Sequence, residues 1–368
     1  PSGKTAIDWF VPSPDGKLVA VSLSKNGSED GTLYVYETTT GKALPDVLPR
    51  VQFPTGGGSA AWDADGKGFF YTRYPMGQER PKEDSNFYMQ VHHHRLGTPV
   101  AQDQHVLGKD FPRIAEVELR RSEDGKYHLA DVANGDGGEH AFYLRGPKGT
   151  WIRIAAFEDR ITSAVFGPDQ KLYALSLKDS PRGKILALDM STQNPRLAMA
   201  PVLVPETEAT IRNLMPASSR LYVTYLVGGP TEVRMFSLEG KALGALGADP
   251  VSSVRVVERL QGDAILFSSS GFARPTACFL FDPAKPSAKP ERTKLIDPPG
   301  FVKEAELEGY EVRREMAVSK DGTQVPVNIV HRKGLVLDGS HPTLLTGYGG
   351  YASSNSPYFD PRTLFWLR

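Results

Sequence analysis

A repeated hairpin pattern constrains the fold of this chain more than any other feature. The pattern is a turn rich in Asp and Gly, a β-rich run, a polar gap and a second β-rich run, with four clear copies followed by two looser ones. Asp-Gly pairs suit such turns, because tight hairpins need positive φ and glycine adopts it without a Cβ clash. The first runs of the six copies are 18–22, 69–71, 127–129, 171–175, 220–224 and 263–267, and the second runs are 32–36, 87–91, 141–144, 184–188, 232–236 and 277–281.

The copies recur at a period of roughly 45 to 60 residues, and each has room for two more strands. A single four-stranded sheet cannot cover its own apolar faces, so neighbouring sheets must stack around an axis. The regular period therefore predicts a mainly β fold, a β-propeller with six blades over residues 1–305. A β-sandwich is the alternative, but it explains the hairpins and not the long period.

The remaining residues, 306–368, follow a different pattern. Tyr310 to Met316 and Val325 to His331 read as two strands around Asp321-Gly322, and Thr343 to Leu345 reads as a short buried strand before a glycine-rich turn. The hydrophobic segment 364–367 reads as a further core strand. A length of 368 residues accommodates two domains, so we place a boundary in the proline-rich stretch 297–300 or just after it.

Bulk composition excludes several classes of partner. The chain has 43 basic and 43 acidic residues, so no general field attracts nucleic acid or anionic lipid. No apolar run approaches the roughly 20 residues of a membrane-spanning helix, and no hydrophobic signal core is present at the N-terminus. One cysteine, Cys278, excludes an internal disulfide. We expect a cytoplasmic protein, with the periplasm as the alternative.

Three further features suggest ligand binding but have simpler explanations. His92-His93-His94 would alternate between the faces of a strand, so they would not converge on one metal ion. Cys278 lies in an apolar run and reads as a buried thiol. Gly56 to Gly58 lack the Lys of a phosphate-binding loop. We therefore expect neither a metal nor a cofactor.

Specific segments resemble one enzyme family. The run 318–333 with Gly347-Tyr348-Gly349-Gly350-Tyr351 resembles the start of the peptidase domain of the prolyl oligopeptidase family of serine peptidases. Segments 44–53, 61–71 and 94–98 are similar to its prolyl endopeptidase branch, and the similarity runs from about Trp9 to Arg368. The resemblance implies a propeller that caps an α/β-hydrolase domain and admits only short peptides, which are cleaved after proline.

The chain departs from that family pattern in two respects. The family has seven blades where six are visible here, so the first blade and the helical segment before it are expected to be missing. The sequence also lacks a Gly-x-Ser-x-Gly elbow and the Asp and His that follow it in an α/β-hydrolase. We interpret the chain as part of a longer, monomeric enzyme rather than a truncated relic, with an oligopeptide substrate and the rest of the hydrolase domain as partners.

The resemblance also assigns candidate site residues. It makes Tyr348 the donor of a phenolic proton to the oxyanion, on a turn where Gly347, Gly349 and Gly350 let the backbone turn and a substrate approach. Tyr351 corresponds to an aromatic of the substrate pocket, Phe111 to a propeller residue that reaches the substrate, and Thr224 to a residue facing the cavity. From the sequence alone, Tyr348 and Phe111 have packing roles as alternatives.

Two other functions remain open. A propeller without catalytic residues serves as a scaffold for protein binding, and the blades alone are compatible with that role. A sister enzyme of different specificity, such as oligopeptidase B or an acylaminoacyl peptidase, shares the overall pattern. The resemblance implies that the residues gripping a proline ring belong to a part of the enzyme outside these 368 residues.

Overall fold

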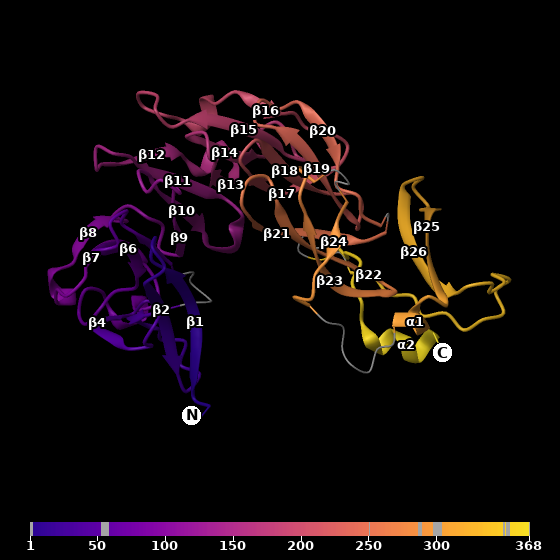
Figure 1. The fold of residues 1–368 in the computed structure, drawn as a ribbon, viewed down its shortest axis with the longest axis horizontal. Coiled ribbons are helices and arrows are strands. Elements are labelled where there is room, and N and C mark those ends of the chain that lie inside the picture. The colour runs from indigo at the N-terminus through magenta and orange to yellow at the C-terminus, as the bar shows by residue number, and fades with distance from the viewer. Residues whose placement is uncertain are drawn as a thin grey trace. The chain divides into compact units, whose positions relative to one another are not determined.

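A computed structural model describes residues 3–52, 59–249, 251–285, 289–296, 304–348, 350 and 354–367. The chain divides into two compact units (Figure 1). The first comprises Pro1–Asp179 and Ile185–Val202, and the second comprises Ser180–Lys184 and Leu203–Arg368.

The described residues form six four-stranded sheets in which consecutive strands are neighbours, and one two-stranded sheet. Pairing is antiparallel, as between β2 and both of its neighbours. The four-stranded sheets are β1 (Thr5–Pro12), β2 (Leu18–Lys25), β3 (Thr32–Glu37) and β4 (Ala43–Pro49); β5 (Ala60–Trp62), β6 (Gly68–Arg73), β7 (Gln90–Arg95) and β8 (Gln104–Leu107); β9 (Ala115–Arg121), β10 (His128–Asn134), β11 (His140–Arg145) and β12 (Trp151–Ala155); β13 (Ile161–Phe166), β14 (Lys171–Ser176), β15 (Lys184–Asp189) and β16 (Val202–Val204); β17 (Thr210–Pro216), β18 (Arg220–Leu226), β19 (Thr231–Ser237) and β20 (Ala242–Ala245); and β21 (Ser253–Arg259), β22 (Ile265–Gly271), β23 (Arg274–Phe281) and β24 (Glu291–Arg292).

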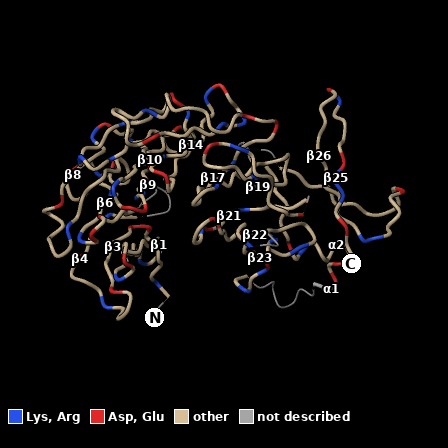
Figure 2. Tube along the Cα trace, turned by 45° about the horizontal axis from the view of Figure 1, so that its top comes forward, with Lys and Arg blue, Asp and Glu red and all other residues tan. Residues whose placement is uncertain are grey.

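The remaining elements are few and short. The two-stranded sheet pairs β25 (Tyr310–Val318) with β26 (Gln324–Arg332). The helices are η1 (Lys82–Asp84), η2 (Val100–Gln102), η3 (Gly135–Gly137), η4 (Phe157–Asp159), η5 (Leu197–Met199), α1 (Glu304–Leu307), η7 (Pro361–Thr363) and α2 (Leu364–Leu367). None of the helices in the described ranges has the length and apolarity that crossing a membrane requires. Figure 2 shows acidic and basic residues interspersed along the sheets.

The mainly β architecture and the six repeated units confirm the prediction from sequence. The two runs recognised in each copy correspond to the second and third strands of a sheet. The turns between the first two strands follow the expected chemistry, with φ of 69° at Gly16 and 66° at Gly66. The fourth copy lacks this glycine, and Gln170 takes its place at φ 58°.

Neighbouring sheets share their apolar cores, which is why none of them needs to be stable alone. The first and second sheets meet in a cluster around Trp62 and Phe69, whose ring centroids lie 4.9 Å apart. The Trp62 indole N–H donates to the Val11 carbonyl oxygen at 3.0 Å and so links the two sheets. Similar clusters join the second to the third sheet, the third to the fourth, and the fifth to the sixth.

One expected strand is shifted along the sequence. The run 87–91 was expected as a strand, but β7 begins only at Gln90. The aromatic residues that suggested a strand have other contacts. Phe87 lies beneath the Arg113 guanidinium at 3.4 Å, and Tyr88 adopts φ 58°, which is incompatible with a strand.

Two expected strands near the C-terminus were wrong. Residues 343–345 have no regular structure, and Leu344 and Leu345 are exposed. A buried strand needs neighbours for its backbone groups, and no strand in the described ranges pairs with this segment. Residues 364–367 form α2, which buries Leu364 and leaves Phe365 and Trp366 exposed.

Candidate functional site

The β25–β26 hairpin introduces the segment that carries Tyr348. Its register runs from Tyr310 opposite Arg332 to Val318 opposite Gln324, so two strands form around Asp321-Gly322 as predicted. Gly322 has φ 84°. The backbone N–H of Thr323 donates to the Asp321 carboxylate at 3.0 Å, and this bond lowers the pKa of that carboxyl group.

The second compact unit holds the base of this hairpin in place. Tyr310 and Leu307 pack against Leu364 in a small apolar cluster. Along β25, the Arg314 guanidinium donates to the carbonyl oxygens of Val227 at 3.0 Å and Gly228 at 2.8 Å, in the turn between β18 and β19. The charged donor of Arg314 therefore attaches the hairpin to the fifth sheet, and the apolar cluster packs the base of the hairpin against α2.

Tyr348 lies beyond the hairpin on a segment without regular structure. Its side chain is 60% exposed, and none of the described residues forms a hydrogen bond with its hydroxyl. A Cβ atom at position 350 would lie 3.2 Å from that hydroxyl oxygen, so glycine there leaves the phenol unobstructed. Chemically, the group is a free O–H donor. Gly349 and Tyr351, the neighbouring candidates, lie outside the described residues.

The two propeller candidates are both buried. Phe111 is 7% exposed in the core between the second and third sheets, with its ring 5.4 Å from that of Tyr143. Thr224 is 7% exposed on β18, between Asn213 of β17 and Val233 of β19. Thr224 and Tyr348 belong to the second unit and Phe111 to the first. Packing accounts for the position of Phe111, and the convergence of these residues on one substrate stays a prediction.

The three consecutive histidines alternate along β7 as predicted. His92 and His94 are buried, whereas His93 lies on the opposite face, 2.8 Å from Asp63. Burial, together with the nearby Arg73 charge, lowers the pKa of His92 to about 3, so this imidazole is neutral. Within the described ranges, no three potential metal ligands lie close enough together to hold an ion.

His94 belongs to a buried ionic network that the sequence did not suggest. Its Nδ1 lies 2.7 Å from Asp103 Oδ1 and its Nε2 lies 3.0 Å from Asp46 Oδ1. Because carboxylates only accept hydrogen bonds, both contacts are satisfied when His94 is an imidazolium. Burial opposes that charge, but the two hydrogen-bonded carboxylates outweigh it and raise the pKa of His94 above its usual value. Asp46 lies on β4, so the network joins the first two sheets.

The sequence signal for this network is weak. Asp46 is a charged residue within a β-rich run, and it lies 48 positions before His94. Nothing local indicates that the two would meet, since their contact depends on how two sheets pack.

The N-terminal β-propeller domain of prolyl oligopeptidase, as a family model, matches residues 1–294. Prolyl endopeptidase of Elizabethkingia meningoseptica is 26% identical over 99% of this chain and 50% of its own length. Prolyl oligopeptidase A of Galerina marginata is 24% identical over 100% of this chain and 52% of its own length. The chain thus spans about half the length of these relatives.

Solved structures show the same fold. A structure from a study of two prolyl endopeptidases has a TM-score of 0.82 and 25% identity, and the match covers 100% of this chain and 53% of that one. Oligopeptidase B from Leishmania major has a TM-score of 0.77 at 19% identity, with coverage of 98% and 50%. Together with the six four-stranded sheets, the match to the propeller domain over most of the chain shows that this protein belongs to the prolyl oligopeptidase family.

Proposed function

We propose that this chain supplies the propeller, residues 1–305, and the first part of the peptidase domain, residues 306–368, of a serine endopeptidase that cleaves short peptides after proline. The name of the Elizabethkingia meningoseptica relative, a prolyl endopeptidase aligned to 99% of this chain, supports the proline preference. In such an enzyme the nucleophilic Ser and its Asp and His partners come from sequence beyond these 368 residues.

The observation that carries the proposal is the unobstructed phenol of Tyr348. It is exposed, it follows the hairpin that opens the second domain, and a glycine at position 350 keeps its hydroxyl accessible. During acyl transfer the carbonyl oxygen becomes negative, so a fixed hydrogen-bond donor near it lowers the barrier. Tyr348 would donate to that oxygen, while Gly349, Gly350 and Tyr351 would border the bound peptide.

The propeller candidates would act on the substrate side. Thr224 would contribute a hydroxyl to the peptide-binding cavity, and Phe111 would reach the substrate only if its ring left the core position described above. The propeller as a whole would act as a filter, because an enclosed cavity admits an extended oligopeptide but not a folded protein.

The test uses the full-length gene product. We expect cleavage of a chromogenic peptide with proline before the reporter group, and loss of activity after treatment with a serine-directed phosphonate. Tyr348→Phe should lower kcat about 100- to 1,000-fold, because one oxyanion donor is lost, with a smaller change in KM. Tyr358→Phe is the matched control, since Tyr358 is equally exposed at 61% and should leave kcat unchanged.

Each other outcome points to a different function. Cleavage after arginine instead of proline would identify a sister oligopeptidase. Absence of any hydrolysis, with retained folding, would favour a binding scaffold. A relative in Galerina marginata is named a dual function macrocyclase-peptidase and is 24% identical. Mass spectrometry of the products should therefore distinguish linear from cyclic peptides.

A further inference from the structure

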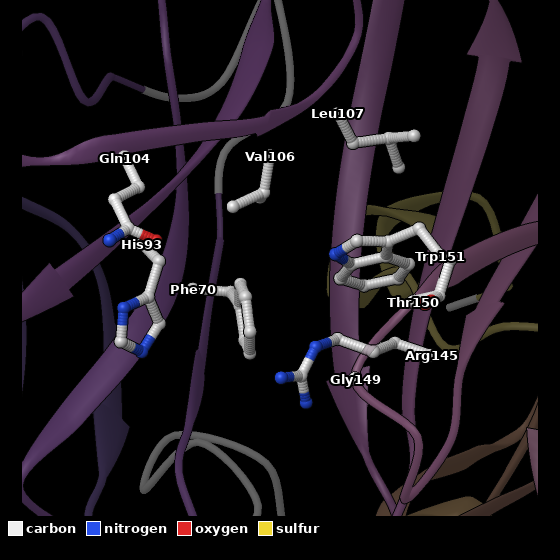
Figure 3. A pocket seen from close by; sticks show the side chains of 9 residues that line it. All are labelled: Phe70, His93, Gln104, Val106, Leu107, Arg145, Gly149, Thr150 and Trp151. Atoms are coloured by element: carbon white, nitrogen blue, oxygen red, sulfur yellow. The ribbon is translucent and has the colours of Figure 1, made fainter.

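A pocket of about 520 Å³ lies between the second and third sheets of the first unit. Phe70 of β6, His93 of β7 and three residues of β8 line one wall, and Arg145, Gly149, Thr150 and Trp151, between the end of β11 and the start of β12, line the other (Figure 3). The first strands of the two sheets, β5 and β9, do not line it. Its volume falls within the range of about 300 to 1,000 Å³ that is typical of small-molecule sites.

The second wall presents two hydrogen-bond donors. None of the described residues forms an ion pair or a hydrogen bond with the Arg145 guanidinium, which instead lies 5.0 Å from the centre of the Phe70 ring. The Trp151 indole nitrogen is buried and has no hydrogen-bond partner among the residues the structure describes. Figure 3 shows that nitrogen turned toward the space between the walls. A buried N–H without a partner is unfavourable, and a ligand acceptor would satisfy it.

The pocket also has an apolar part, beside the polar side chains of Gln104 and Thr150. The Phe70 ring packs against His93 at 4.7 Å and edge-on against Trp151 at 5.5 Å, and Val106 and Leu107 complete the apolar surface. His93 is held from its other side by Asp63. None of the described residues lining the pocket is Asp or Glu. The charge of Arg145 is therefore not neutralised within the pocket.

We propose that this pocket binds a small organic carboxylate with an apolar or aromatic body. The carboxylate accepts hydrogen bonds from Arg145 and from the Trp151 N–H, and the body packs against Phe70 and Leu107. A guanidinium fits a carboxylate well because its fork of donors matches the two oxygens. The ligand is either a free acid or the C-terminal carboxylate of a peptide whose last side chain is apolar. This inference does not depend on the proposed peptidase function.

The test titrates the 368-residue chain with 3-phenylpropionate and follows the indole N–H signals of its four tryptophans. The Trp151 signal, assigned from its loss in Trp151→Phe, should shift and saturate at millimolar ligand. The neutral analogue 3-phenylpropionamide should bind at least about tenfold more weakly, because it cannot form the charged hydrogen bonds. The tripeptide Ala-Ala-Phe and its C-terminal amide test whether the ligand is a peptide or a free acid. If it is a peptide, the tripeptide with its free C-terminal carboxylate binds and the amide does not.

Variants test the assigned donors by ligand-observed NMR titration. Arg145→Gln should weaken 3-phenylpropionate binding at least about tenfold, and Trp151→Phe should weaken it several-fold, since each loses a donor and the latter keeps an aromatic ring. Lys148→Gln is the control, because it removes an exposed positive charge three residues from Arg145 and should leave affinity unchanged.

Three results would overturn the proposal: no saturable shift of the Trp151 signal, equal affinity for the acid and the amide, or equal weakening by Lys148→Gln and Arg145→Gln. The acid–amide comparison uses the unaltered chain, so it decides the matter even if Arg145→Gln fails to fold.

Discussion

Replacing His94 tests the strongest electrostatic claim that the structure supports. The side chains of His94, Asp46 and Asp103 are 1%, 1% and 3% exposed, so the network is closed to solvent. His94→Gln preserves much of the volume but removes the charge and can donate to only one carboxylate at a time. The other carboxylate would then be buried without its counter-charge.

The size of the effect follows from what each carboxylate retains. Removing one partner of a buried ion pair typically destabilises a protein by about 3 to 5 kcal/mol. Here the Tyr71 hydroxyl still donates to Asp103 at 2.7 Å, and the Gly97 N–H still donates to Asp46 at 2.6 Å. Since neither carboxylate loses every donor, we expect a loss near the lower end, about 3 kcal/mol in the free energy of unfolding.

His93→Gln is the matched control on the adjacent residue. The His93–Asp63 pair has a similar distance of 2.8 Å, but its side chains are 27% and 28% exposed. Partly exposed pairs contribute about 0 to 1 kcal/mol, so this variant should lose no more than about 1 kcal/mol.

The pH dependence gives an independent readout. The folded pKa of His94 is raised above its unfolded value of about 6.5. The contribution of His94 to the free energy of unfolding is therefore complete below about pH 6.5 and is lost as pH rises through the folded pKa. His140, whose pKa is raised by its hydrogen bond to Asp131, adds a slope of the same sign. The difference between the wild type and His94→Gln isolates the His94 part, so the stability gap between them should narrow as pH rises.

Urea unfolding followed by tryptophan fluorescence measures these values. Three of the four tryptophans, Trp9, Trp62 and Trp151, lie in the same compact unit as His94, so the signal reports mainly on that unit. The reasoning fails if His94→Gln and His93→Gln lose the same stability, or if the gap between wild type and His94→Gln is constant from pH 6 to pH 9.

Three further predictions test other parts of the fold. Between about pH 6.5 and pH 3 only the unfolded state protonates His92, so this residue lowers the free energy of unfolding by up to about 1.4 kcal/mol for each pH unit of acidification. His92→Gln should remove this part of the pH dependence, and an unchanged slope in urea unfolding would contradict the expectation. Gly68→Ala should lower the free energy of unfolding by about 2 to 3 kcal/mol, since a Cβ there meets the backbone oxygen of His94 at 2.6 Å. Gly66→Ala, where φ is 66° and the space around the Cβ is open, should lower it by about 1 kcal/mol. Equal losses of stability in thermal unfolding would refute the clash at position 68. Arg314→Ala should speed hydrogen exchange in β25 and β26 about tenfold, because two carbonyl contacts at the fifth sheet are lost; unaltered exchange would show that the apolar cluster alone holds the hairpin.

The sequence predicted the middle of each sheet better than its edges. The second and third strands have neighbours on both sides and are rich in buried β-forming residues, as in β14 and β18. The fourth strands have one neighbour, and β20 (ALGA) is exposed throughout. Such a strand leaves no alternating pattern to detect. The shifted start of β7 has a different cause, since Phe87 packs beneath the guanidinium of Arg113, between β8 and β9, instead of pairing along a strand.

The candidate site was less predictable because its members depend on distant parts of the chain. The hairpin 310–332 could be read from alternation and its Asp-Gly turn. The segment 343–345 was assigned as a strand from its composition, yet a strand forms only beside another strand. Phe111 illustrates the converse problem, since a phenylalanine suited to touch a peptide is equally suited to the core, and only its neighbour Tyr143 distinguishes the two positions.

The charged and aromatic groups of this chain that could have a specific role lie at the junctions between sheets more than in the hairpins. The Asp-Gly turns at Gly16 and Gly66 have nearly the same φ, because both close the same kind of tight hairpin. The junctions differ. Between the first two sheets lies a buried histidine held by two carboxylates, whereas the second and third sheets flank a guanidinium that has no ion-pair partner among the described residues. In a repeat protein, neighbour contacts decide whether each unit is stable, so His94→Gln at the first junction should alter stability, whereas Arg145→Gln at the second should alter binding.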